Sequence, residues 1–137
     1  MTATLVQIMD GIEARLATIE GLRTSPTFPG QINPPQAVVG VPAIGEYDTA
    51  LSGRANATLG FTVTVYTSAA IDRVGQTTLA QLADPTAAGS IPAAIAADRS
   101  LGGLVSDCRV ASFEPLGLDE VGVIGYFGGR FTLRILL

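Results

Sequence analysis

The sequence predicts one α+β domain, in which an antiparallel or mixed β-sheet carries an N-terminal helix and two middle helices packed on one face. Apolar residues recur at helical spacing near the N-terminus, but alternate with polar residues in the middle and at the C-terminus. Turn signals divide the chain into the order α-β-β-β-α-α-β-β, and the short connections favour antiparallel pairing. Because the 137 residues contain no internal repeat, we expect residues 1–137 to form a single domain.

The N-terminal helix is predicted by five apolar residues at spacings of 3, 4, 4 and 3, namely Leu5, Ile8, Ile12, Leu16 and Ile19. Thr4 and Gln7 have the spacing of a capping box, which satisfies the first free N–H groups of a helix. Gly21 suits the position after a helix, where the backbone often adopts the left-handed conformation. We therefore expect an amphipathic helix that buries one side.

A proline-rich region follows this helix. Pro26 and Pro29 frame a loop or an edge strand, because proline cannot donate to a sheet ladder. The apolar run at 37–41 predicts a short buried strand, whereas residues 42–56 are expected to form an exposed loop or the arm of a long hairpin.

The clearest strand is Thr58 to Thr67, where large apolar residues alternate with threonine and tyrosine. Ser68 is a possible cap for a helix that stops at Asp84-Pro85 and has one face made of Ile71, Val74, Thr78 and Leu82. A second short helix is expected after Ser90, with Pro92 in its first turn.

The C-terminal third returns to strands. Asp107 to Phe113 predicts a strand, and Glu114 to Asp119 predicts the turn that follows it. Val121 to Leu137 predicts one long strand or a bulged pair, because Gly128-Gly129 interrupts it. Within this segment Arg130, Thr132 and Arg134 are expected to point away from the core.

Composition argues against catalysis and against a nucleic-acid-binding face. The net charge is -4, and there is no histidine, so an imidazole metal site or a Ser-His-Asp triad is impossible. Cys108 is the single cysteine, and in a predicted strand a buried small side chain is a more common role than a reactive thiol. Asp119-Glu120 fits a solvated turn better than a cation site. We expect no enzyme activity, no cofactor and no metal.

The balance of apolar and charged residues favours contact with other subunits. Hydrophobic residues make up 47% of the chain and charged residues 15%, against roughly 25% charged in an average soluble domain. The alternative is an alanine- and glycine-rich monomer. The longest charge-free stretch, Thr24 to Gly45, contains five prolines, so it does not predict a membrane helix.

Two groups of residues are candidates for an interface. The segment 42–56 holds Glu46, Tyr47, Asp48 and Arg54, which can reach a neighbouring subunit or belong to an ordinary mobile hairpin. Arg130 and Arg134 can pair with an acidic residue of another subunit, although a solvated outer sheet face explains them equally well.

Several segments in this order resemble the tail terminator proteins of long-tailed, siphovirus-type phages, particularly those of actinobacterial hosts. The quoted segments span nearly the whole chain: Ile19-Glu20-Gly21-Leu22-Arg23, Gln31-Ile32-Asn33-Pro34-Pro35-Gln36-Ala37-Val38-Val39, Phe61-Thr62-Val63-Thr64-Val65, Asp72-Arg73-Val74-Gly75-Gln76, Leu82 to Pro85, Gly89-Ser90-Ile91, Ala94-Ile95, Asp98, Leu101-Gly102-Gly103 and Phe131-Thr132-Leu133. The likeness lies in their order, since no single segment is specific.

The resemblance implies a homohexameric ring at the head-tail junction of the virion, assembled in the host cytoplasm. Such a ring caps the tail tube protein, stops its polymerisation and docks the head-closure or connector protein. Genome DNA then passes through the ring without specific binding, and no membrane is involved. The alternatives are another neck subunit (a head-closure or connector protein), a carboxylate-dependent hydrolase or lyase, and a secreted carbohydrate-binding module.

Overall fold

A five-stranded mixed sheet and three helices make up the described part of the chain. The computed structural model describes residues 4–27, 32, 34–42, 58–68, 73–121 and 124–136. The elements are α1 (Leu5–Leu16), β1 (Arg23–Ser25), β2 (Gln36–Val39), β3 (Thr58–Ser68), α2 (Arg73–Ala83), α3 (Ile91–Ala96), β4 (Asp107–Val121) and β5 (Ile124–Leu136). The strand order is β1-β2-β3-β5-β4, with β1 parallel to β2 and the other pairs antiparallel. The predicted α+β class and element order are confirmed.

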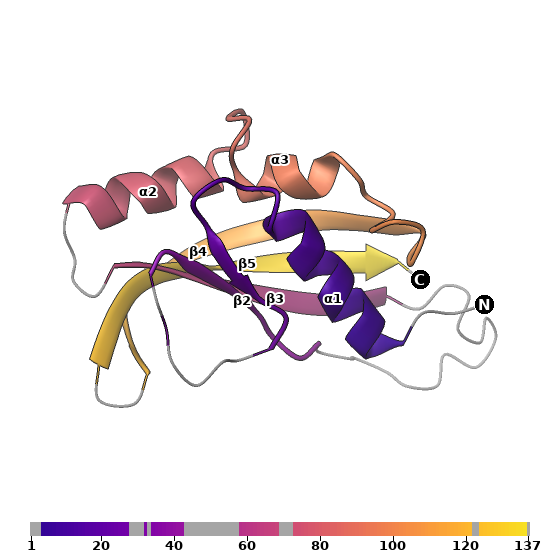
Figure 1. Cartoon of the computed structure of the whole chain (residues 1–137), viewed down its shortest axis with the longest axis horizontal. Coiled ribbons are helices and arrows are strands. Elements are labelled where there is room, and N and C mark those ends of the chain that lie inside the picture. Colours follow the sequence, from indigo (N-terminus) through magenta and orange to yellow (C-terminus); the bar gives the residue numbers. More distant parts are fainter. Residues whose placement is uncertain are drawn as a thin grey trace.

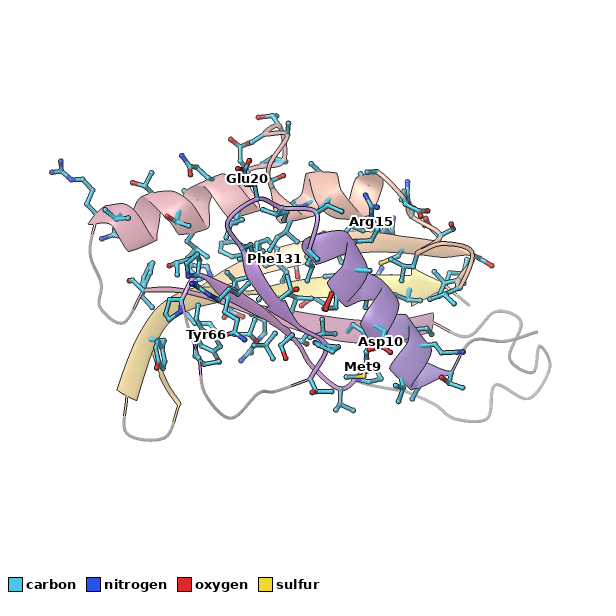
Figure 2. The ribbon with its side chains drawn as sticks, viewed as in Figure 1. Met9, Asp10, Arg15, Glu20, Tyr66 and Phe131 are labelled. Carbon is cyan, nitrogen blue, oxygen red and sulfur yellow. The ribbon has the colours of Figure 1, made fainter. Side chains whose placement is uncertain are left out.

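All three helices pack on one face of the sheet (Figure 1). One apolar core joins α1, α2 and α3 to the inward residues of β2, β3, β4 and β5. Phe61 and Phe131, which are fully buried, lie in this core, and Figure 2 shows Phe131 between the helices and the sheet. In the described part of the chain, no helix therefore covers the opposite face of the sheet.

The N-terminal helix forms as its sequence predicts. The Thr4 side chain accepts from the Gln7 backbone N–H at 3.1 Å, and the Gln7 side chain accepts from the Thr4 N–H at 2.8 Å. Ile8, Ile12 and Leu16 are fully buried. The helix ends at Leu16, earlier than the apolar pattern suggests, and Ile19 packs against the core from the turn that follows.

The predicted turn at Glu114 to Asp119 is wrong. The strand β4 continues through Pro115 to Val121 and pairs with β5 over its whole length. Proline is tolerated there because β4 is the edge of the sheet, and the register shifts near Ala111 and Leu116 absorb the irregularity. The long hairpin curves away from the other strands at its far end (Figure 1).

The predicted face of α2 is also wrong in part. Val74 is 73% exposed, whereas Leu79 and Leu82 are buried. Gly75 faces β3 instead, where its carbonyl oxygen accepts a bond of 3.0 Å from the buried Thr67 hydroxyl. The backbone thus approaches the sheet at the glycine, which turns Val74 outward. Ile71 lies outside the described residues.

The short helix α3 begins where the sequence predicts. The Ser90 side chain accepts from the Ala93 N–H at 3.2 Å, and Pro92 lies in the first turn. Arg15 of α1 donates from its Nε to the carbonyl oxygen of Ala94 at 3.1 Å. This bond ties α1 to α3 above the sheet.

Candidate subunit interface

The sheet face opposite the helices is polar over β3, β5 and β4. The alternation of β3 places Thr62 and Thr64 on this face, opposite Thr132 and Arg130 of β5. At the β2 end a separate small cluster covers it, made of Ile32, Val38, Tyr66 and Tyr126. The part of this face that the small cluster does not cover lies over β5 and β4; we call it the open face.

Two arginines face each other across the outer strand pair of this open face. Arg109 of β4 is the register partner of Arg134 of β5, and both side chains are exposed. Neither side chain forms a hydrogen bond or ion pair with another described residue. Like charges directly opposite each other in a sheet are destabilising. We call Arg109 and Arg134 the basic pair.

The nearest acidic residue on the same strand already has a partner. Asp107 lies two residues before Arg109, so both belong to the same side of β4. Its Oδ2 accepts from Arg99 Nη2 at 2.8 Å. Asp107 is therefore engaged at the sheet edge rather than with the basic pair.

Arg130 has a different environment from the basic pair. Its register partners are Glu114 on β4 and Thr64 on β3. Opposite charges at cross-strand positions stabilise a sheet by roughly 0.2–1 kcal/mol. Arg130 thus has an acidic cross-strand neighbour, with which it forms no ion pair within 4.0 Å, whereas Arg109 and Arg134 have each other as neighbours.

The outer side of α1 carries acidic and apolar residues together. Val6, Asp10, Glu13 and Ala17 follow one another at helical spacing on the side away from Ile8 and Ile12; we call these four residues the outer stripe. Val6 is 67% exposed, and Asp10 is exposed as well. Arg15 lies on another side of the helix and turns toward α3 (Figure 2).

The exposed apolar surface is smaller than the composition suggests. Among the described residues the large hydrophobic side chains left exposed are Leu5, Val6, Val41, Val74 and Leu136. Most of the other large hydrophobic side chains pack into the two clusters. Leu136 lies on the open sheet face, two residues after Arg134.

A hollow of about 330 Å³ lies between α3 and the edge strand β4, lined by Pro92, Ile95, Ala96, Arg99, Cys108, Arg109 and Val110. Cys108 is fully buried, as expected for a small core residue. Burial, together with the neighbouring Asp107 carboxylate, raises the pKa of its thiol to about 12. A thiol of this kind stays protonated and is a poor nucleophile.

The described ranges contain no group of candidate metal ligands. Nowhere in them do three histidine, cysteine, aspartate or glutamate side chains come together as metal ligands would. The lowered pKa values of Asp84 and Asp98 come first from hydrogen bonds with Thr86 and Ser100 within their own turns. Within the same ranges, every helix is too short or too polar to cross a membrane.

The sequence-predicted contact residues divide into two groups. Glu46, Tyr47, Asp48 and Arg54 lie outside the described residues. Arg130 and Arg134 lie on the open face of β5, as predicted. Arg109 was not among the candidates, although its place in the alternation of β4 predicts the same face.

The acidic residues of α1 were missed as candidates too. Asp10 and Glu13 look like the solvated side of any amphipathic helix.

Comparison of the chain with protein-family models and with curated proteins finds no match.

Proposed function

We propose that the chain is a structural virion protein that forms a ring at the top of a phage tail tube. There it stops tube polymerisation and provides the surface on which the head docks. The segment resemblance to tail terminators motivates this assignment, and the unbalanced basic pair is the structural observation that supports it. Arg109 and Arg134 repel each other in the isolated chain, so an acidic neighbour stabilises both.

The one-sided layer of helices also supports assembly. The open sheet face and the free edge of β4 offer backbone and side-chain groups to a neighbouring subunit. A ring uses one heterologous contact repeated until it closes. The stoichiometry we propose is six, with the tail tube protein below and the head-closure or connector protein above.

The charge balance agrees with a channel for DNA. Each chain carries -4, so a ring of several copies is strongly acidic. Such a ring repels the phosphate backbone rather than holding it. Genome DNA can therefore pass without specific binding.

The direct functional test is tail length in particles that lack the protein. We expect abnormally long tubes, because nothing stops polymerisation. Tails of normal length that fail to join heads would contradict termination and point to the alternative, a head-closure or connector subunit. Wild-type protein expressed in trans during infection should restore normal tail length.

A further inference from the structure

We propose that the ring contact joins the basic pair of one subunit to the outer stripe of α1 in the next. Arg109 and Arg134 of one copy then face Asp10 and Glu13 of another copy of this chain. This inference rests on the proposed ring and names the two surfaces that build it.

The basic pair has no acidic partner among the described residues of its own subunit. The two arginines are cross-strand neighbours, and neither makes an ion pair or hydrogen bond with a described residue. Asp107, two residues before Arg109, is held by Arg99 at 2.8 Å. An incoming carboxylate relieves the repulsion and forms charge-assisted hydrogen bonds with guanidinium groups.

The outer stripe supplies carboxylates in a matching arrangement. Asp10 and Glu13 are three residues apart on one helix, so their side chains lie on neighbouring turns. They are spaced to meet two arginines that face each other across adjacent strands, about 5 Å apart at the backbone. Arg15 of the same helix forms its hydrogen bond with the carbonyl oxygen of Ala94 and none with Asp10 or Glu13.

Both surfaces also carry an exposed apolar residue beside the charges. Val6 is 67% exposed, one turn before Asp10, and Leu136 is 40% exposed, two residues after Arg134. Burying these side chains excludes water from the rim of the ion pairs, which strengthens them. The contact therefore combines charge complementarity with apolar burial.

The two surfaces cannot meet within one molecule. The core residues of α1 pack on the helix-covered face of the sheet, whereas the alternation of β4 and β5 places the basic pair on the opposite face. A contact between them joins different patches of two copies, which makes it heterologous. Repetition of such a contact gives a ring when the rotation closes.

The test uses charge reversal on the full-length chain. The basic-face variant is Arg109→Glu with Arg134→Glu, and the stripe variant is Asp10→Arg with Glu13→Arg. The combined variant carries all four changes. Arg73→Glu is the control, because Arg73 is exposed on α2 and belongs to neither surface. Thermal unfolding followed by circular dichroism establishes that each variant folds.

Ring formation is measured by native mass spectrometry, and by co-sedimentation with purified uncapped tail tubes. We expect each reversed variant to lose at least about 30-fold in subunit affinity, because the reversal sets like charges opposite each other across the contact. The combined variant should regain the ring, and Arg73→Glu should keep it. An equimolar mixture of the two reversed variants should also form rings, with the two variants alternating, because every contact between unlike variants then joins an acidic surface to a basic one.

The outcomes separate this inference from the proposed function. If the wild-type chain neither forms rings nor binds tubes, the proposed function fails. If the wild-type and both reversed variants form equal rings, the ring stands and the named contact is overturned. Rings of the basic-face variant that no longer bind tubes would assign the basic pair to the tube protein, which also overturns the inference.

Discussion

Gly128 of β5 lies directly against the carbonyl oxygen of Val65 in β3, so that a Cβ atom at this position would overlap that oxygen. The neighbouring Gly129 is also constrained, since its Cβ would lie 2.5 Å from an atom of the Phe113 ring. The two glycines let β5 pass closely between β3 and β4, where the long hairpin curves.

Gly128→Ala should therefore destabilise the fold. We expect a loss of about 1–3 kcal/mol in the free energy of unfolding, the typical effect of forcing extra atoms into packed structure. Gly89→Ala is the control, because no atom lies within 4 Å of its Cβ position; its effect should stay within about 0.5 kcal/mol. Urea denaturation measures the stability of both variants. Equal denaturation midpoints for the two would contradict the close approach of Gly128 to Val65.

Removing one charge of the basic pair should stabilise the isolated subunit while weakening assembly. Arg134→Thr ends the repulsion with Arg109, and we expect a gain of about 0.2–1 kcal/mol in the free energy of unfolding. Arg130→Thr is the matched change on the same strand, and it should give no gain, because its cross-strand neighbour is Glu114. Urea denaturation under monomeric conditions compares the two. Equal changes in the free energy of unfolding would show that the cross-strand neighbour does not determine how much each arginine destabilises the sheet.

Salt should weaken the subunit contact. Raising the ionic strength from 0.1 M to 1 M shortens the Debye length from about 10 Å to about 3 Å, which screens partly exposed ion pairs. We expect the dissociation constant of the subunit contact to rise with salt, so that rings, or ring-capped tubes, fall apart at higher protein concentrations. Native mass spectrometry or co-sedimentation measures this. Rings that become tighter with salt would indicate a contact made mainly by apolar groups.

The buried thiol of Cys108 should make stability fall in alkaline solution. Its pKa rises from 9.0 to about 12 on folding, so the unfolded chain ionises this thiol first. The stability contribution is complete below pH 9 and is lost as the pH rises toward 12. Cys108→Ala lacks this ionisation, so its stability should decline less steeply over that range in urea titrations. If the stability of the wild type and of Cys108→Ala fell equally with pH, the raised pKa of the buried thiol would be contradicted.

Local signals predicted the elements whose own residues determine them. The capping box at Thr4 and Gln7, the alternation around Phe61 and the Ser90 cap all depend on neighbours within a few residues. The turn predicted at Pro115 failed because proline breaks only strands that need its N–H, and β4 is the edge of the sheet. The edge position depends on the whole topology, which local sequence does not contain.

The candidate interface was predictable only in part for the same reason. The alternation of β5 placed Arg130 and Arg134 on the outer face, and the structure confirms that position. The difference between them arises from register, which sets Glu114 opposite Arg130 and Arg109 opposite Arg134. Register depends on the turn between β4 and β5 and on two bulges, so single-strand patterns do not reveal it.

The most direct test of the account is the mass of the native wild-type assembly, measured for the protein alone and for the protein released from tail tubes. The account predicts a closed ring, six copies in our assignment, formed either in solution or on the tube end. A chain that remains strictly monomeric under both conditions and does not bind tubes would contradict it.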